Sequence, residues 1–311
     1  MKVKSQRSEV KGQKSEISGQ RRMAPTGRPL GVTVIACVLL NAGFSGCQEA
    51  PAVTVRVLPN AEAVATASTG GGDAAATAAG YGNFLGSVTF EGTAPPLAPV
   101  IKAGAAGVKD PEVCGVTDIP NENLVVNPQN KGIANVVIYL DKKPASVKPE
   151  LAAVPTEPVL FDQKGCRFLP HVVAVRVGQP LLVLSGDSVA HNTHTFPGRN
   201  NVFNQTIPAN ERKGVPCPYS KPEAAPIRVQ CDLHTWMKAY HFPVDHPYVA
   251  VTDADGKFRI EGLPAGKHVF KVWQEGAKDS NKLLDRKLEI TIEADKDTTK
   301  TLSYGANLFA G

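Results

Sequence analysis

The stretch Ile227-Arg228-Val229-Gln230-Cys231-Asp232-Leu233-His234-Thr235-Trp236-Met237 combines a strand pattern with three side chains that can hold a metal. Up to Cys231, apolar and polar residues alternate, which predicts a half-buried β-strand with the cysteine sulfur on its inner face. The following residues add an imidazole at His234 and a thioether at Met237. We therefore expect a thiolate, an imidazole and a thioether to meet at the end of one strand.

A second imidazole comes from the segment Ala190-His191-Asn192-Thr193-His194. Two histidines, one cysteine and a weak axial methionine form the blue-copper ligand set, which suits an ion that alternates between Cu(I) and Cu(II). The candidate ligands in the two segments are His191 or His194, Cys231, His234 and Met237. His194 is the second choice for the first histidine, because three residues along a strand it faces the opposite side. Zinc is the competing metal, but structural zinc normally takes four Cys or His ligands.

Composition favours a turn-rich β protein. The 311 residues leave room for one large or two medium domains. Aromatic residues make up only 6%, while there are 28 Gly and 25 Pro. The formal charge of +5 comes from the N-terminus, since residues 1–46 hold eight of the 34 Lys and Arg but two of the 29 acidic residues. The nearly neutral remainder gives no electrostatic reason to expect a nucleic-acid partner.

The basic N-terminus is followed by an apolar run, Gly31–Leu40, that is too short to span a bilayer and is typical of a signal peptide. Phe44-Ser45-Gly46-Cys47 resembles a bacterial lipobox, which predicts lipidation of Cys47 and anchoring to a membrane. Simple cleavage and an uncleaved anchor are the alternatives, and Met23 competes with Met1 as the true start. In each case we expect the folded part outside the cytoplasm, in the periplasm or on the envelope.

The amino-acid composition of the remaining chain changes near residue 80. Residues 48–80 are rich in Ala, Thr and Gly and predict a flexible linker. From Tyr81 onward, short alternating segments predict strands, and we find no strong amphipathic helix. Asp253-Ala254-Asp255-Gly256 predicts a hairpin turn between strands at Val249–Val251 and Phe258–Ile260. The expected fold class is all-β.

The region from about Phe161 to Val244 resembles the cupredoxins, in particular the plastocyanin and amicyanin group. The likeness rests on Cys-x2-His-x2-Met and on the His191-Asn192 segment. It implies a Greek-key β-sandwich with one type 1 copper, held by His191, Cys231, His234 and Met237. It also implies that Asn192 braces the cysteine loop and that electrons pass through an exposed edge of His234. Trp236 and Tyr240 are near enough in sequence to shape that surface; the alternative is that they are core or rim aromatics.

A second resemblance covers segments on either side of this region. The segments are Gly86–Gly92, Ala134–Leu140, Val251–Gly266 and Leu288–Ile292. They are similar to carboxypeptidase-regulatory-like, or transthyretin-like, β-sandwiches. This module is also described as carbohydrate-binding-like. This implies a small sandwich from residues 81–145 and 247–305, with the copper domain inserted as residues 146–246. A single sandwich with a C-terminal extension is the alternative. The whole chain resembles bacterial lipoproteins labelled methylamine-utilisation-like.

Three cysteines remain beside Cys47 and Cys231 in the exported part. In an oxidising compartment Cys166 can pair with Cys114 or with Cys217, and spacing leaves both pairings open.

An enzyme is not expected. Multicopper oxidases and copper nitrite reductases connect further copper through histidines beside the ligand cysteine, whereas Gln230 and Asp232 flank Cys231 and the sequence holds no His-x-His pair. The leading hypothesis is an electron carrier that meets an unidentified protein redox partner. The alternatives are a non-redox lipoprotein that binds glycans or mediates adhesion, and a copper chaperone or store, although a store favours more than the three Met present.

Overall fold

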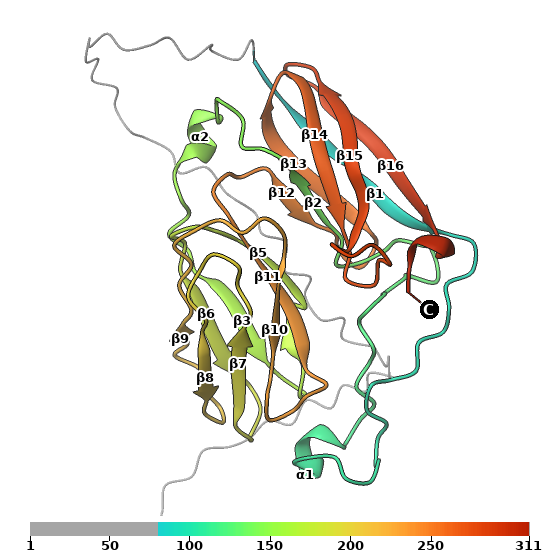
Figure 1. The fold of residues 1–311 in the computed structure, drawn as a ribbon, viewed down its shortest axis with the longest axis vertical. Helices are drawn as coiled ribbons and strands as arrows, with labels where there is room; N and C mark the ends of the chain where they lie inside the picture. The colour runs from blue at the N-terminus through green and yellow to red at the C-terminus, as the bar shows by residue number, and fades with distance from the viewer. Residues whose placement is uncertain (1–79, 311) are drawn as a thin grey trace, which may run out of the picture. The chain divides into compact units, whose positions relative to one another are not determined.

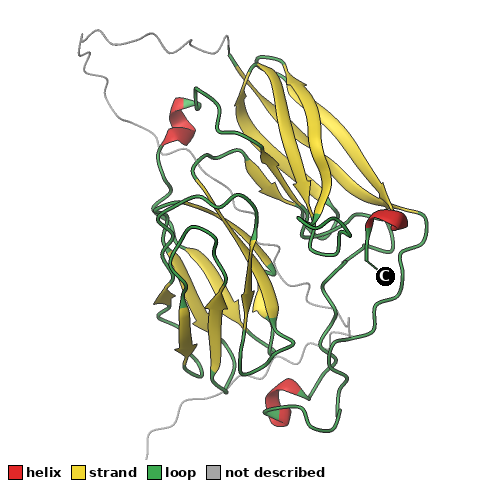
Figure 2. Cartoon of the chain, in the orientation of Figure 1, coloured by secondary structure: helices red, strands yellow, loops and turns green. Residues whose placement is uncertain are grey.

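A computed structural model describes residues 80–310. The predicted leader (1–47), the lipidation site Cys47 and the linker (48–80, apart from Gly80) lie outside the described residues. Within residues 80–310 the chain forms sixteen strands, two four-residue helices and one short 3-10 helix, so the predicted all-β fold is confirmed. Figure 2 shows how strands and connecting loops dominate. In this part of the chain no helix has the length and apolar character needed to cross a membrane.

One β-sandwich is built from both ends of the described chain (Figure 1). Its sheets have the strand orders β13-β1-β16 and β12-β2-β14-β15. The strands are β1 (Tyr81–Glu91), β2 (Val137–Leu140), β12 (Val249–Val251), β13 (Lys257–Pro264), β14 (Gly266–Trp273), β15 (Leu283–Ile292) and β16 (Asp297–Gly305).

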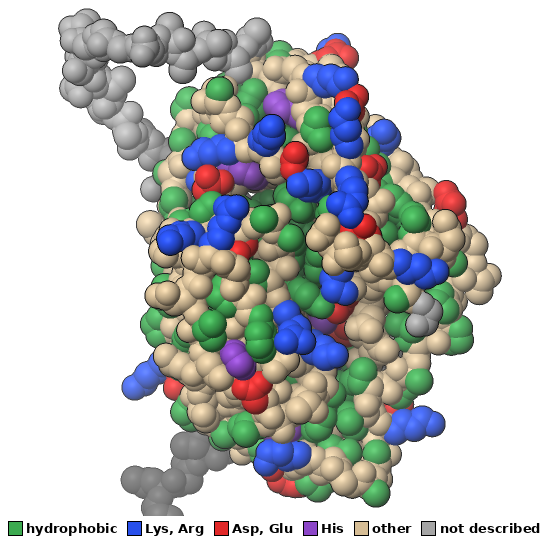
Figure 3. Space-filling model, viewed as in Figure 1, with side chains coloured by type: hydrophobic (Ala, Val, Ile, Leu, Met, Phe, Trp, Pro, Cys, Tyr) green, Lys and Arg blue, Asp and Glu red, His purple; other side chains and the backbone are tan. Residues whose placement is uncertain are grey.

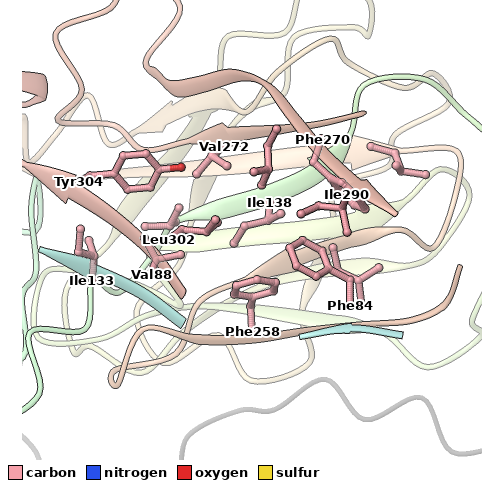
Figure 4. Close-up of a cluster of buried hydrophobic side chains, with 14 of the residues drawn as sticks. Phe84, Val88, Ile133, Ile138, Phe258, Phe270, Val272, Ile290, Leu302 and Tyr304 are labelled. Carbon is pink, nitrogen blue, oxygen red and sulfur yellow. The ribbon is translucent and has the colours of Figure 1, made fainter. Parts of the chain in front are cut away.

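The core of this sandwich lies between its two sheets (Figure 4). Alternate residues of each strand point inward, as period-two patterning requires. Phe84 on β1 packs edge-on against Phe258 on β13, with ring centroids 5.0 Å apart, and contacts Phe270 from the opposite sheet. All three rings are buried, so this cluster joins the two sheets.

The connection at Asp253–Gly256 differs from the predicted hairpin. β12 pairs with β2, whereas β13 pairs with β1 in the other sheet, so the turn crosses between sheets. Gly256 has a φ of 74°, and a Cβ there would approach the carbonyl oxygen of Val88 to 2.4 Å. The four residues do form a turn, but the local chemistry of a turn does not determine which sheet the following strand joins.

The second sandwich follows β2 in the chain. Its sheets have the orders β5-β11-β10-β7-β8 and β4-β3-β6-β9, and the β3–β6 and β5–β11 pairs are parallel. The strands are β3 (Val159–Gln163), β4 (Phe168–Leu169), β5 (Val172–Arg176), β6 (Leu181–Ser185), β7 (His191–Thr195), β8 (Asn204–Ile207), β9 (Val215–Pro216), β10 (Ile227–Gln230) and β11 (Lys238–Val244).

Strand register brings the two histidine-bearing segments together. β7 and β10 are antiparallel, with Gln230 opposite His194. Moving back along β7 to His191 therefore corresponds to moving forward past the end of β10, into the loop that contains His234. Along β10 the inner face is buried and Arg228 is exposed, as the alternation predicts. The metal-ligand candidates consequently lie at one end of this sandwich.

Two short helices lie in the connections: α1 (Pro111–Cys114) between β1 and β2, and α2 (Pro149–Ala152) between β2 and β3. A third short element, η1 (Ala306–Leu308), follows β16. A cluster that includes Tyr139, Phe242 and Trp273 contains residues from both sandwiches. On the face shown in Figure 3, basic and acidic side chains are interspersed rather than gathered in one patch of a single sign.

Candidate metal centre

Three predicted ligands converge. His191 begins β7, Cys231 follows β10, and His234 lies in the loop before β11. The Nδ1 atoms of the two histidines are 3.0 Å apart, and Cys231 Sγ is 3.6 Å from His234 Nδ1. One ligand atom from each residue lies within 4.8 Å of the others, and all three residues are fully buried.

These separations fit a single ion. Nitrogen and sulfur ligands bind zinc at about 2.0–2.3 Å, and donors at such distances around one ion lie roughly 3–3.6 Å apart. A thiolate with two imidazoles also suits copper, whose preferred soft and nitrogen donors are present here. The set therefore has both the spacing and the donor chemistry of a metal site.

Met237 lies in the same buried core cluster as Cys231. Its backbone N–H donates to the carbonyl oxygen of His234 (2.9 Å), and its own carbonyl oxygen accepts from the N–H of Cys231 (3.2 Å). These two hydrogen bonds close the seven-residue loop on itself. The role of the thioether as axial ligand stays a prediction.

His194 lies on the other side of β7. Its Nδ1 is 2.9 Å from Asp232 Oδ2, and its side chain is 23% exposed. His191 is instead fully buried, as expected for residues three apart on a strand. The structure therefore brings His191, and not His194, to Cys231 and His234.

Asn192 holds the cysteine loop in place. Its backbone N–H donates to Cys231 Sγ (3.3 Å), and its side-chain oxygen accepts from the N–H groups of Asp232 (2.5 Å) and Leu233 (3.3 Å). Hydrogen bonds to a thiolate favour the charged form that binds metal. These three hydrogen bonds fix the start of the loop that contains His234.

Each histidine is also held from behind by a carboxylate. His191 Nε2 lies 2.8 Å from Asp187 Oδ2, and His234 Nε2 lies 2.8 Å from Asp110 Oδ2. A carboxylate at Nε2 fixes the ring and its tautomer, so that Nδ1 is left free to bind a metal. Sequence reasoning missed both acids. Asp187 is four residues before His191 and was visible as a neighbour, but nothing in the sequence links Asp110 to His234.

The protonation equilibria match a site made for a cation. Burial by itself raises the pKa of the Cys231 thiol, but hydrogen bonds from His191, His234 and Asn192 outweigh burial and lower this pKa to about 6. Burial has the opposite effect on His191, whose pKa it lowers, but Asp187 and the Cys231 thiolate outweigh burial and raise this pKa to about 9. Without metal, the thiolate is therefore paired with an imidazolium, whose proton a metal ion would replace.

The structure joins Cys114 to Cys166 in a disulfide, one of the two pairings left open above. Among the described cysteines, Cys217 and Cys231 are free and buried. The disulfide is adjacent to the site, because the backbone N–H of Cys166 donates to Asp187 and its carbonyl oxygen accepts from the Trp236 indole N–H (3.3 Å). Trp236 also packs edge-on against His234, with ring centroids 5.3 Å apart.

The cupredoxin resemblance implied that an edge of His234 is exposed, and this prediction is wrong for this chain. His234 is fully buried. Asp110, which reaches it from the connection between β1 and β2, occupies its Nε2, and Trp236 packs against its ring. The covering residue comes from far along the chain, so the loop sequence gives no sign of it.

No protein-family model and no curated protein sequence matches the chain. Among solved structures, a Cu-containing nitrite reductase from Thermus scotoductus matches with a TM-score of 0.26 and 19% identity, over 30% of this chain and only 23% of that one. A purple cupredoxin from Nitrosopumilus maritimus matches at 0.23 and 15%, over 28% and 99%. Amicyanin from Paracoccus versutus matches at 0.25 and 17%, over 34% and 97%. Structural similarity at this level does not support an inference about function, so the candidate site is identified from its own geometry.

Proposed function

We propose that this chain is a type 1 copper protein that carries single electrons by outer-sphere transfer. The observation that supports the proposal is the fully buried convergence of His191, Cys231 and His234. Two imidazoles and one thiolate, with a methionine in the same loop, favour copper over structural zinc.

The residues around the site would keep its geometry constant. His191, Cys231 and His234 would hold copper, with Met237 as the weak fourth ligand. Bound copper supplies the one-electron exchange between Cu(I) and Cu(II). The carboxylates of Asp187 and Asp110 hold the two rings, and Asn192 holds the cysteine loop, so the ligands need to move little when the charge changes. Burial excludes water from the ligand atoms.

The setting of this activity is also proposed. The signal peptide and the lipobox cysteine Cys47 support export and attachment to the envelope membrane. An electron carrier requires a redox partner, which we propose to be a protein. Gln230 and Asp232 offer no histidine bridge from Cys231 to a second copper, which supports a carrier rather than an enzyme.

The proposal is tested by adding Cu(II) to the purified metal-free protein. We expect an intense absorption near ~600 nm from charge transfer between the thiolate and copper. His191→Ala should abolish the band, whereas His194→Ala, the matched control on the same strand, should keep it. A colourless protein with measurable glycan affinity would refute the carrier and support the glycan-binding alternative.

A further inference from the structure

The connection between β1 and β2 contains a compact loop, residues 101–119, which we call the cap. Ile101 and Ile119 form an antiparallel bridge at its base. Hydrogen bonds from the N–H of Ile119 to Ile101 O (2.8 Å) and from the N–H of Gly104 to Gly115 O (2.9 Å) close it further. The cap is therefore a folded unit rather than an open connection, and it can be followed through α1 in Figure 1.

The cap packs on the sandwich that holds the metal centre. Cys114 and Ile119 are buried in the core cluster of that sandwich, and Val108 and Val113 pack against it. The Cys114–Cys166 disulfide joins the cap covalently to the same sandwich. Although the cap is part of the connection between two strands of the other sandwich, apolar packing and a covalent bond hold it at the copper site.

Asp110 occupies an unusual position within the cap. It is the N-cap residue of α1, with φ 52° and ψ 56°, in the left-handed region that few non-glycine residues adopt. An N-cap aspartate normally accepts a hydrogen bond from the first turn of its helix, but the Asp110 side chain makes no such bond to α1. Its carboxylate instead accepts from His234 Nε2 at 2.8 Å. Beside an ion pair with its neighbour Lys109 (3.6 Å), the carboxylate therefore makes its close contact not to its own helix but to a predicted ligand 124 positions away.

We propose that the cap is a lid over the metal centre and that Asp110 is the positioning residue that fixes His234 beneath it. This inference rests on the proposed function. With the cap in place, a protein partner cannot contact Nε2 of His234, because the carboxylate fills that position and the ring is fully buried. Electron exchange through this histidine therefore requires displacement of the cap.

The position of the cap is tested first on the metal-free protein, by diethylpyrocarbonate labelling of each histidine, followed by mass spectrometry. In the wild type, His234 should be labelled as slowly as the fully buried His241 and far more slowly than His194, whose side chain is 23% exposed. Asp110→Ala should speed labelling of His234 about tenfold or more, the factor expected from losing one charge-assisted hydrogen bond. Glu112→Gln, which neutralises an exposed carboxylate on α1, is the matched control and should change nothing.

A second variant removes the lid. Because Ile101 and Ile119 are paired, residues 102–118 can be replaced by an Asn-Gly turn, together with Cys166→Ala. His234 should then be labelled about as fast as His194, and the copper-loaded variant should exchange electrons between its own molecules at least ~10-fold faster than the wild type. Slow labelling of His234 in this variant, or unchanged electron exchange in a variant that is still blue, would overturn the lid. A wild type that never turns blue would instead overturn the proposed function, and the labelling result would still decide whether the cap covers His234.

Discussion

Replacing Asp187 by asparagine tests whether a buried carboxylate organises the candidate metal centre. Asp187 Oδ2 accepts from His191 Nε2 (2.8 Å) and from the N–H of Cys166 (2.8 Å), while Oδ1 accepts from the N–H of Gly165 (2.6 Å). An asparagine of the same shape has one oxygen and one NH2 group. If its oxygen faces His191 and Cys166, both contacts remain, but the acceptor is neutral and the NH2 group faces the N–H of Gly165, an exposed residue. If it is turned the other way, the donors of the two buried residues face its NH2 group.

The magnitude follows from these contacts. In the less costly orientation, the hydrogen bonds from His191 and Cys166 lose the charge of their acceptor, which costs about 1 kcal/mol each, so Asp187→Asn should lower the free energy of unfolding of the metal-free protein by about 1–3 kcal/mol. The hydrogen bond that orients His191 is also weakened or lost. Since partners behind a metal-bound histidine typically contribute 10–100-fold in affinity, Cu(II) binding should weaken by about that factor.

Urea unfolding of the metal-free protein and competitive Cu(II) titration measure the two effects. Asp245→Asn is the matched control, because the ion pair of Asp245 with Lys143 (3.9 Å) joins two side chains that are 42% and 52% exposed, and such exposed pairs contribute only about 0–1 kcal/mol. Copper affinity within twofold of the wild type in Asp187→Asn would refute the view that this carboxylate positions His191.

Three further outcomes are expected for stability. Cys114→Ser with Cys166→Ser should lower the free energy of unfolding by about 4 kcal/mol, the loop-closure value for a separation of 52 residues; urea unfolding of oxidised wild type and variant checks it, and a loss under about 1 kcal/mol would contradict the cap's attachment by this bond. Burial lowers the pKa of His246 to about 4, so the unfolded state takes up a proton at this ring before the folded state does. The free energy of unfolding should therefore be unaffected by His246 above pH ~6.5 and should fall by roughly 3 kcal/mol as the pH is lowered to 4. Unfolding measured at pH 7 and pH 4 should show this loss in the wild type and not in His246→Asn, and equal pH dependence of the two proteins would be inconsistent with it. Phe84→Ala, which empties the centre of the first core, should cost about 3–5 kcal/mol by thermal or urea unfolding, whereas Leu160→Ala at a 54% exposed position should cost much less.

Local patterning decided much of what could be predicted. The alternation of apolar and polar residues that ends at Cys231 predicts which side of β10 is buried, because successive side chains of a strand face opposite sides. The same rule separates His191 from His194, and the structure brings only His191 to Cys231. Cys231 and Met237 are six positions apart, so they bound a short loop that two backbone hydrogen bonds close. These features depend on residues close in the chain, so a single sequence contains them.

Other features depend on which distant segments pack together. The turn at Asp253–Gly256 has the chemistry of a hairpin, yet only the assembled core decides that β13 joins the opposite sheet. Cys166 had two partners that spacing could not separate, and the packing of the cap against the second sandwich brings Cys114 to it.

The contrast is sharpest at His234. Its position three residues after Cys231 is local, and the sequence by itself determined that it could serve as a ligand. Its burial is not local, because Asp110 reaches Nε2 from a different connection of the chain. An aspartate before a short helix is ordinary as an N-cap, so no pattern in the sequence distinguishes this one. Only the tertiary structure decided that its carboxylate faces the imidazole, since that contact exists only once two sandwiches have folded and the cap has packed on one of them.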